Sequence, residues 1–146
     1  MNKFKVIQID GNDSEILSVS LKDILDNIEN GEEFNWSILW LQATGDLKNK
    51  PIIEFEKEIK KSEAGYIISW NDLNELSEGF FQVIEILLIG DSIISNIKRY
   101  SEDHHMYNSC DFTIELVDSS YWLIHSKKLK TLEKIKATLP GVKELF

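Results

Sequence analysis

Histidine and cysteine, the residue types best suited to bind a transition metal, are scarce in this chain of 146 residues. His104 and His105 are adjacent, so their side chains point apart in any regular backbone conformation. The other candidates are His125 and Cys110. This spacing matches none of the standard zinc-ligand patterns. We therefore expect no metal and no other cofactor.

A nucleophilic arrangement of Cys110, His125 and Asp118 can be written from the sequence. Cys110 has no cationic neighbour in sequence and does not begin a helix, the two settings that lower the pKa of a thiol. The chain also lacks a Gly-rich phosphate loop, a nucleophile elbow and a dinucleotide fingerprint. We expect that the protein is not an enzyme, and that Cys110 is a buried thiol in a reducing compartment.

Carboxylates and aromatic rings alternate in residues 102–122, which contain no Lys or Arg. Carboxylates attract and orient a cationic partner, and aromatic side chains supply the desolvated anchors that dominate binding energy. The candidate partner-binding residues are Glu102, Asp103, Tyr107, Asp111, Glu115, Asp118, Tyr121 and Trp122. The alternative is that Trp122 belongs to the core and that the carboxylates are merely solvated.

The net charge of −9 is distributed unevenly along the chain. Residues 1–126 carry 23 acidic and 10 basic side chains, whereas residues 127–146 carry six lysines and two glutamates. Such an acidic body repels a nucleic-acid backbone, so nucleic-acid binding is not expected. The expected partner is instead a cationic protein.

A β-hairpin between Cys110 and Ser126 must position most of these side chains. Apolar Phe112, Ile114 and Leu116 alternate with polar residues, the period-2 pattern of a half-buried strand. The short polar residues 118–120 favour a turn. The aromatic and β-branched residues 121–125 then predict a second strand with both faces covered.

The rest of the chain predicts an α+β fold. Strands are predicted at 4–9, 35–44, 66–68 and 80–89, and a shorter strand or strand-to-loop segment within 51–61. Helices are predicted after Ser20, after Ser69 and over 127–139, and a turn at 10–13. The isoleucines at 93–97 allow a helical turn, and residues 101–109 predict an exposed loop. We expect one domain, 1–146, with a mostly antiparallel sheet of about five to six strands packed by two to three helices. The residues expected in the core include Trp40, Phe81, Ile84 and Leu116.

No segment approaches the length of continuous apolar sequence that a membrane span requires, and the first ten residues do not resemble a signal peptide. We therefore expect a cytoplasmic protein without membrane contact.

Three stretches carry a resemblance to a known group of proteins. They are the hairpin core D-x-x-x-E-x-x-D-S-S-Y-W from Asp111 to Trp122, the strand N-W-S-I-L-W-L from 35, and I-S-W-N-D-L from 68. They resemble small acidic bacterial immunity proteins encoded beside polymorphic or contact-dependent toxins. The resemblance implies a protein that neutralises a cognate toxin, for example a nuclease, by covering its basic active-site surface. The alternative is a structural or adaptor subunit of a bacterial assembly, and the oligomeric state stays open.

Overall fold

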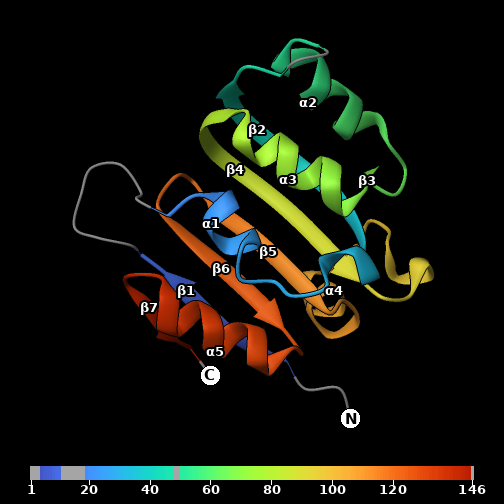
Figure 1. Cartoon of the computed structure of the whole chain (residues 1–146). Coiled ribbons are helices and arrows are strands. Elements are labelled where there is room, and N and C mark those ends of the chain that lie inside the picture. The colour runs from blue at the N-terminus through green and yellow to red at the C-terminus, as the bar shows by residue number, and fades with distance from the viewer. Residues whose placement is uncertain (1–3, 11–18, 48–49, 146) are drawn as a thin grey trace.

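The computed structural model describes residues 4–10, 19–47 and 50–145. Their seven strands form one antiparallel sheet in the order β3-β2-β4-β5-β6-β1-β7 (Figure 1). The strands are β1 Lys5–Ile9, β2 Asn35–Gly45, β3 Tyr66–Ile68, β4 Phe80–Asp91, β5 Phe112–Val117, β6 Tyr121–Ser126 and β7 Val142–Glu144. The helices are α1 Leu21–Leu25, α2 Ile52–Lys61, α3 Trp70–Glu78, α4 Asp103–Ser109 and α5 Leu129–Thr138. Single 3₁₀ turns span Gly31–Glu33 and Ile94–Asn96.

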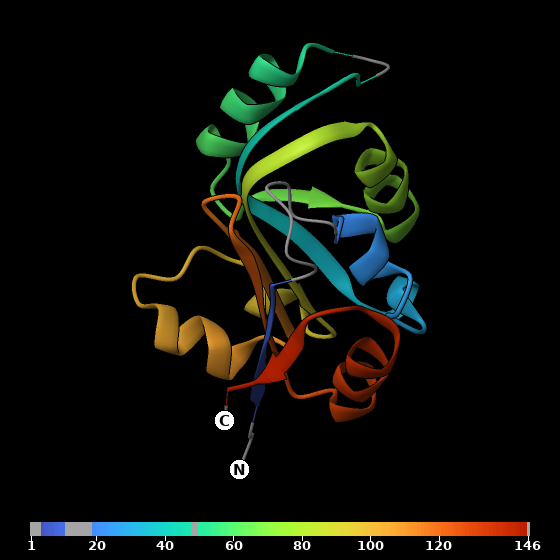
Figure 2. The same cartoon turned by 90° about the vertical axis from the view of Figure 1, so that its left-hand side faces the viewer.

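Helices cover the two faces of the sheet unequally. Figure 2 shows α1, α3 and α5 on one side and α4 on the other. We call these sides the helix-covered face and the α4 face. The main core lies on the helix-covered face and includes Trp36, Phe112 and Trp122. A smaller cluster on the α4 face joins Leu39, Ile89, Ile97, Met106 and Cys110.

The α+β fold and the antiparallel sheet are confirmed, although the sheet has more strands than the expected five to six and there are more than three helices. The added strand β7 comes from the basic tail and pairs with β1 through Ile7–Glu144 and Ile9–Val142. The predicted helix starts at Ser20 and Ser69 are also confirmed, as is the helix predicted over 127–139, which is α5. Ser20 accepts from the backbone N–H of Asp23, and Ser69 from that of Asp72. The predicted turn at 10–13 lies mostly outside the described residues.

The strand or strand-to-loop segment predicted within residues 51–61 is wrong, because this segment is helix α2. Phe55 and Ile59 are buried and four residues apart, which places them on one side of a helix. The glutamates that suggested an alternating strand lie on the rest of the helix surface. One of them, Glu56, accepts from the backbone N–H of Ala43 at 3.0 Å, so α2 also covers part of β2.

The exposed loop predicted at 101–109 is also wrong for the most part, because residues 103–109 form α4. The helical turn that the sequence allows at 93–97 is present as the 3₁₀ turn Ile94–Asn96. Helix α4 is too short to show a period, and it buries only Met106 completely. Arg99, in the loop before it, donates to the carbonyl oxygens of Leu39, Ile59 and Ser62 at 2.7 to 3.0 Å. The loop is thereby fixed to both β2 and the end of α2.

Of the residues expected in the core, Leu116 is confirmed at 5% exposure. Phe81 and Trp40 are exposed at 79% and 41%, so these two predictions are wrong, and Ile84 is only half-buried. Phe81 is exposed because β4 extends beyond β5, so the first residues of β4 have a strand neighbour in β2 alone. Trp40 is exposed because it lies on the α4 face, opposite Leu87.

The hairpin is confirmed, with Phe112 opposite Ser126 and Val117 opposite Tyr121. Its turn is tight, because the N–H of Ser120 donates to the carbonyl of Val117 at 2.9 Å. Asp118 and Ser119 both have positive φ, 47° and 57°, as in the type I′ turns that suit twisted hairpins. Side chains other than Gly, Asn and Asp rarely adopt this conformation.

We expect the substitution Ser119→Gly to raise the free energy of unfolding by about 0.5 to 1 kcal/mol. Relief of the left-handed strain exceeds the entropy that glycine adds to the unfolded chain. Urea denaturation of both proteins measures the difference. Ser120→Gly is the matched control and should be destabilising, since φ is not positive there and the hydroxyl donates to the carbonyl of Asp118 at 3.0 Å. Equal effects at the two positions would contradict the explanation.

Candidate protein-interaction surface

The strand register brings four side chains into one row on the α4 face. Trp40 of β2 is opposite Leu87 of β4, Leu87 is opposite Glu115 of β5, and Glu115 is opposite Leu123 of β6. All four are only partly buried or exposed. Helix α4 covers the neighbouring row, which contains Thr113 and His125, and leaves this one accessible.

Two hydrogen bonds pair an aromatic side chain with a carboxylate along this row. The Tyr107 hydroxyl of α4 donates to Glu115 Oε1 at 3.0 Å. The Trp40 indole Nε1 donates to Glu85 Oε2, also at 3.0 Å. Each carboxylate is thus fixed by one donor and keeps lone pairs that could accept further hydrogen bonds. We call the group Trp40, Glu85, Asp103, Tyr107, Glu115 and Tyr121 the aromatic–carboxylate surface.

Glu115 occupies a partly dehydrated position. Burial raises its pKa, the hydrogen bond from Tyr107 lowers it, and the negative charge of Asp103 raises it again. The pKa of Tyr107 is also raised, first by burial and then by the charge of Glu115. A cation placed beside Glu115 would replace the lost hydration and stabilise the charged form of this carboxylate.

The covered row behind Glu115 contains two buried polar atoms with no hydrogen-bond partner among the described residues, Thr113 Oγ1 and His125 Nδ1. The two residues are directly opposite each other in β5 and β6. The Tyr107 ring stacks on His125 with 3.6 Å between centroids and 2° between planes. Phe4 packs against the same imidazole at 5.5 Å. Burial therefore lowers the pKa of His125 from 6.5 to about 4, although Asp103 opposes the shift.

This arrangement makes stability depend on pH. The unfolded chain takes up a proton on His125 near pH 6.5, while the folded chain does so only near pH 4. The stability that the neutral His125 contributes to the folded state is therefore complete above pH 6.5 and is lost as the pH falls toward 4. Glu115 has the opposite effect on the free energy of unfolding, because its raised pKa means that the folded protein binds a proton there more readily than the unfolded chain does.

We expect the free energy of unfolding to fall by about 2 kcal/mol more in the wild type than in His125→Phe when the pH is lowered from about 7.5 to about 5. Phenylalanine keeps the ring stack but cannot bind a proton. Urea denaturation at both pH values measures the difference, and the other titrating groups are common to both proteins. NMR titration of the His125 imidazole provides an independent check. An imidazole midpoint near 6.5 would contradict the burial argument.

The structure brings half of the predicted partner-binding residues together. Asp103, Tyr107, Glu115 and Tyr121 belong to the aromatic–carboxylate surface. Glu102 lies just before α4, where its exposed carboxylate is 3.7 Å from His105 Nε2. Asp118 lies at the exposed tip of the hairpin.

Asp111 has a structural position instead. It is buried, its carboxylate accepts from the N–H of Ser92 at 3.0 Å, and its own N–H donates to Asp91 Oδ1 at 2.8 Å. These reciprocal bonds join the end of β4 to the start of β5. The Ser126 hydroxyl donates to the Asp111 carbonyl at 2.7 Å. The carboxylate therefore stabilises backbone and is not presented to a partner.

Trp122 also lies away from the surface. It is 1% exposed, packs in the main core on the helix-covered face, and donates from Nε1 to the carbonyl of Val19 at 2.9 Å. Trp40 and Glu85 are not among the partner-binding residues predicted from the sequence. No local pattern could have found them as a pair, because 45 residues separate them and only the β2–β4 register makes them neighbours.

Cys110 is buried, as expected, and burial raises the pKa of its thiol to about 11. A thiol with this pKa is a poor nucleophile near neutral pH. In the described ranges, no cluster of three or more His, Cys, Asp or Glu side chains could hold a metal ion. No helix of the described part is long and apolar enough to cross a membrane.

Comparison with known proteins gives no relative: no protein-family model, curated protein or solved structure matches the chain.

Proposed function

We propose that this protein is a non-enzymatic binding protein that neutralises a cationic protein partner. By the resemblance of its sequence to immunity proteins, the partner is a cognate toxin whose basic active-site surface, such as that of a nuclease, is covered in the complex. The observation that carries the proposal is the pair of hydrogen-bonded aromatic–carboxylate contacts, Tyr107–Glu115 and Trp40–Glu85.

The chemistry of this surface suits a partner rich in Lys and Arg. Aromatic rings attract cations through their faces and contribute large contact areas. Lys60 of the chain itself illustrates this preference, because its Nζ lies 5.9 Å from the centre of the Trp40 ring. Residues 100–126 contain five carboxylates and no Lys or Arg, so little in this segment competes with a partner's cations.

The rigidity of the surface supports binding further. The carboxylates of Glu85 and Glu115 project from adjacent strands in the middle of the sheet, and each is held by a donor. Side chains already fixed in the free protein lose little entropy on association. The proposal places the protein in the cytoplasm and requires no cofactor or nucleic acid.

The direct test is capture of the partner from the native host with tagged protein, followed by co-expression of the captured protein. The proposal expects a basic protein whose expression alone is toxic and whose toxicity is suppressed by this chain. Capture of components of a larger assembly, without a toxic basic protein among them, would favour the adaptor function. Capture of no basic protein would overturn the proposal.

A further inference from the structure

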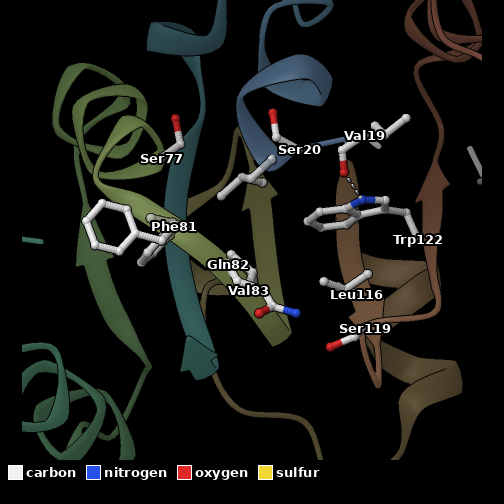
Figure 3. A pocket seen from close by; sticks show the side chains of 11 residues that line it. Val19, Ser20, Ser77, Phe81, Gln82, Val83, Leu116, Ser119 and Trp122 are labelled. Atoms are coloured by element: carbon white, nitrogen blue, oxygen red, sulfur yellow. Dashed lines mark hydrogen bonds between the residues drawn. The ribbon is translucent and has the colours of Figure 1, made fainter. Parts of the chain in front are cut away.

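A pocket of about 130 Å³ opens on the helix-covered face, away from the aromatic–carboxylate surface. Figure 3 shows Phe81 and Gln82 of β4 on one side of it and Leu116, Ser119 and Trp122 of the hairpin on the other. Val19 to Leu21, at the start of α1, and Ser77 of α3 complete the wall. The volume is close to the roughly 150 Å³ of cavities that accommodate a benzene ring. One aromatic or branched aliphatic side chain would fit.

Beside the pocket, β4 presents an open edge. β5 pairs with β4 only from Ile86 to Gly90, and the hairpin turn adds one contact, in which the N–H of Ser119 donates to the Ile84 carbonyl at 2.8 Å. Within the described ranges, no strand pairs with residues 80–83 on the side away from β2. An open edge of this kind is a template for an added strand.

One of the two exposed side chains of this edge, Phe81, is large and apolar, and the other is Gln82. Phe81 is 79% exposed, the highest value among the large hydrophobic residues that the structure describes. A strand added to residues 80–83 would cover its ring. The pocket lies next to the same residues, so one side chain of that strand could enter it.

The side chains around this edge are mainly acidic. Glu78 and Asp118 are exposed and adjacent in sequence to the pocket residues Ser77 and Ser119. Asp46 is also exposed, and its backbone N–H donates to the Gly79 carbonyl at 2.9 Å. Lys22 of α1 is already held by Asp26 at 2.6 Å and by Asn74 at 3.2 Å. Like charges would repel a second copy of this edge, whereas a strand with basic ends would be attracted.

We infer that residues 80–83 of β4 and the adjoining pocket form a docking site for an extended segment of another protein. The segment adds to β4 as a strand, inserts one apolar side chain into the pocket, and carries Lys or Arg at both ends. This site lies on the opposite face from the aromatic–carboxylate surface, so the inference does not depend on the proposed function.

The test uses the full chain and the synthetic peptide Lys-Lys-Thr-Val-Thr-Phe-Thr-Val-Thr-Lys-Lys. Binding is measured by fluorescence anisotropy of the labelled peptide, and its location by the amide NMR signals of residues 80–83. The peptide should bind at least about tenfold more tightly than one with Glu at both ends. A proline in place of the central Phe should abolish binding, because proline removes the ladder donor and the anchor.

Two protein variants distinguish binding at this site from non-specific binding to exposed apolar side chains. Phe81→Ser should weaken peptide binding about tenfold, the loss expected from one exposed aromatic contact. The matched control is Ile67→Ser, because Ile67 is 56% exposed on β3, the strand at the outer edge of the sheet. It should bind the peptide as the wild type does. Absence of binding at millimolar peptide, equal losses in the two variants, or equal affinity for the Glu-ended peptide would each overturn the inference.

Discussion

Trp36→Ala is expected to lower the free energy of unfolding by about 3 to 5 kcal/mol, the range for removing a large aromatic side chain from a core. Trp36 is fully buried and lies between the rings of Trp70 and Phe112, with centroid distances of 5.3 and 5.5 Å. Its Nε1 donates to the carbonyl of Gly31 at 2.8 Å, so alanine would also leave this acceptor without its donor. Urea denaturation followed by circular dichroism measures the loss.

The same packing makes Gly90 difficult to replace. A Cβ at Gly90 would lie 2.5 Å from the Trp36 ring, closer than real side-chain contacts, and that ring is held by its stacking and its hydrogen bond. Gly90→Ala should cost about 1 to 3 kcal/mol by overpacking. In the Trp36→Leu background the added methyl group should cost much less, because the clashing ring is gone. Equal costs in both backgrounds would show that the clash is not the cause.

The second large effect is expected at the aromatic–carboxylate surface. The double substitution Glu85→Gln with Glu115→Gln removes two charges and keeps an oxygen that can accept from Trp40 and Tyr107. If these carboxylates pair with desolvated partner cations, affinity for the captured partner should fall by about 2 to 5 kcal/mol, or about 30-fold to several thousand-fold. Surface plasmon resonance should place most of the loss in the dissociation rate.

The matched control is Glu32→Gln with Glu54→Gln, at two exposed glutamates outside the surface. It changes the net charge equally, so it should slow association slightly and change affinity by less than about threefold. Denaturation should show that the double variant at the surface is folded, because neutralising Glu115 removes a carboxylate whose charged form burial disfavours. Equal losses of affinity in the two double variants would place the interface elsewhere.

The sequence by itself determined the features that depend on local spacing. The hairpin follows from alternation in residues 112–116 and from polar turn residues that adopt positive φ. The starts of α1 and α3 follow from Ser20 and Ser69, whose side chains accept from backbone groups three residues ahead. Burial of Cys110 and the α+β class follow similarly, because neighbouring residues encode them through strand and helix periods.

Local spacing failed where the same residues satisfy two periods. In residues 52–61, glutamates at alternate positions predict a strand, while Phe55 and Ile59 fit one side of a helix. The edge of β2 decided between them, since α2 packs along it and Glu56 binds the backbone of Ala43. Helix α4 is likewise stabilised by contacts with the sheet. Met106 packs with Leu39 and Ile89, which are distant in sequence, and Tyr107 donates to Glu115 of the hairpin.

Only the tertiary structure decided which of the aromatic and acidic residues lie on the aromatic–carboxylate surface. Tyr121 and Trp122 are adjacent, yet a strand directs successive side chains to opposite faces, so α1 buries Trp122 while Tyr121 stays on the α4 face. Asp111 is likewise buried, and its carboxylate accepts a hydrogen bond from the backbone N–H of Ser92. The pairing of Trp40 with Glu85 required a register between distant strands, which composition and local spacing do not encode.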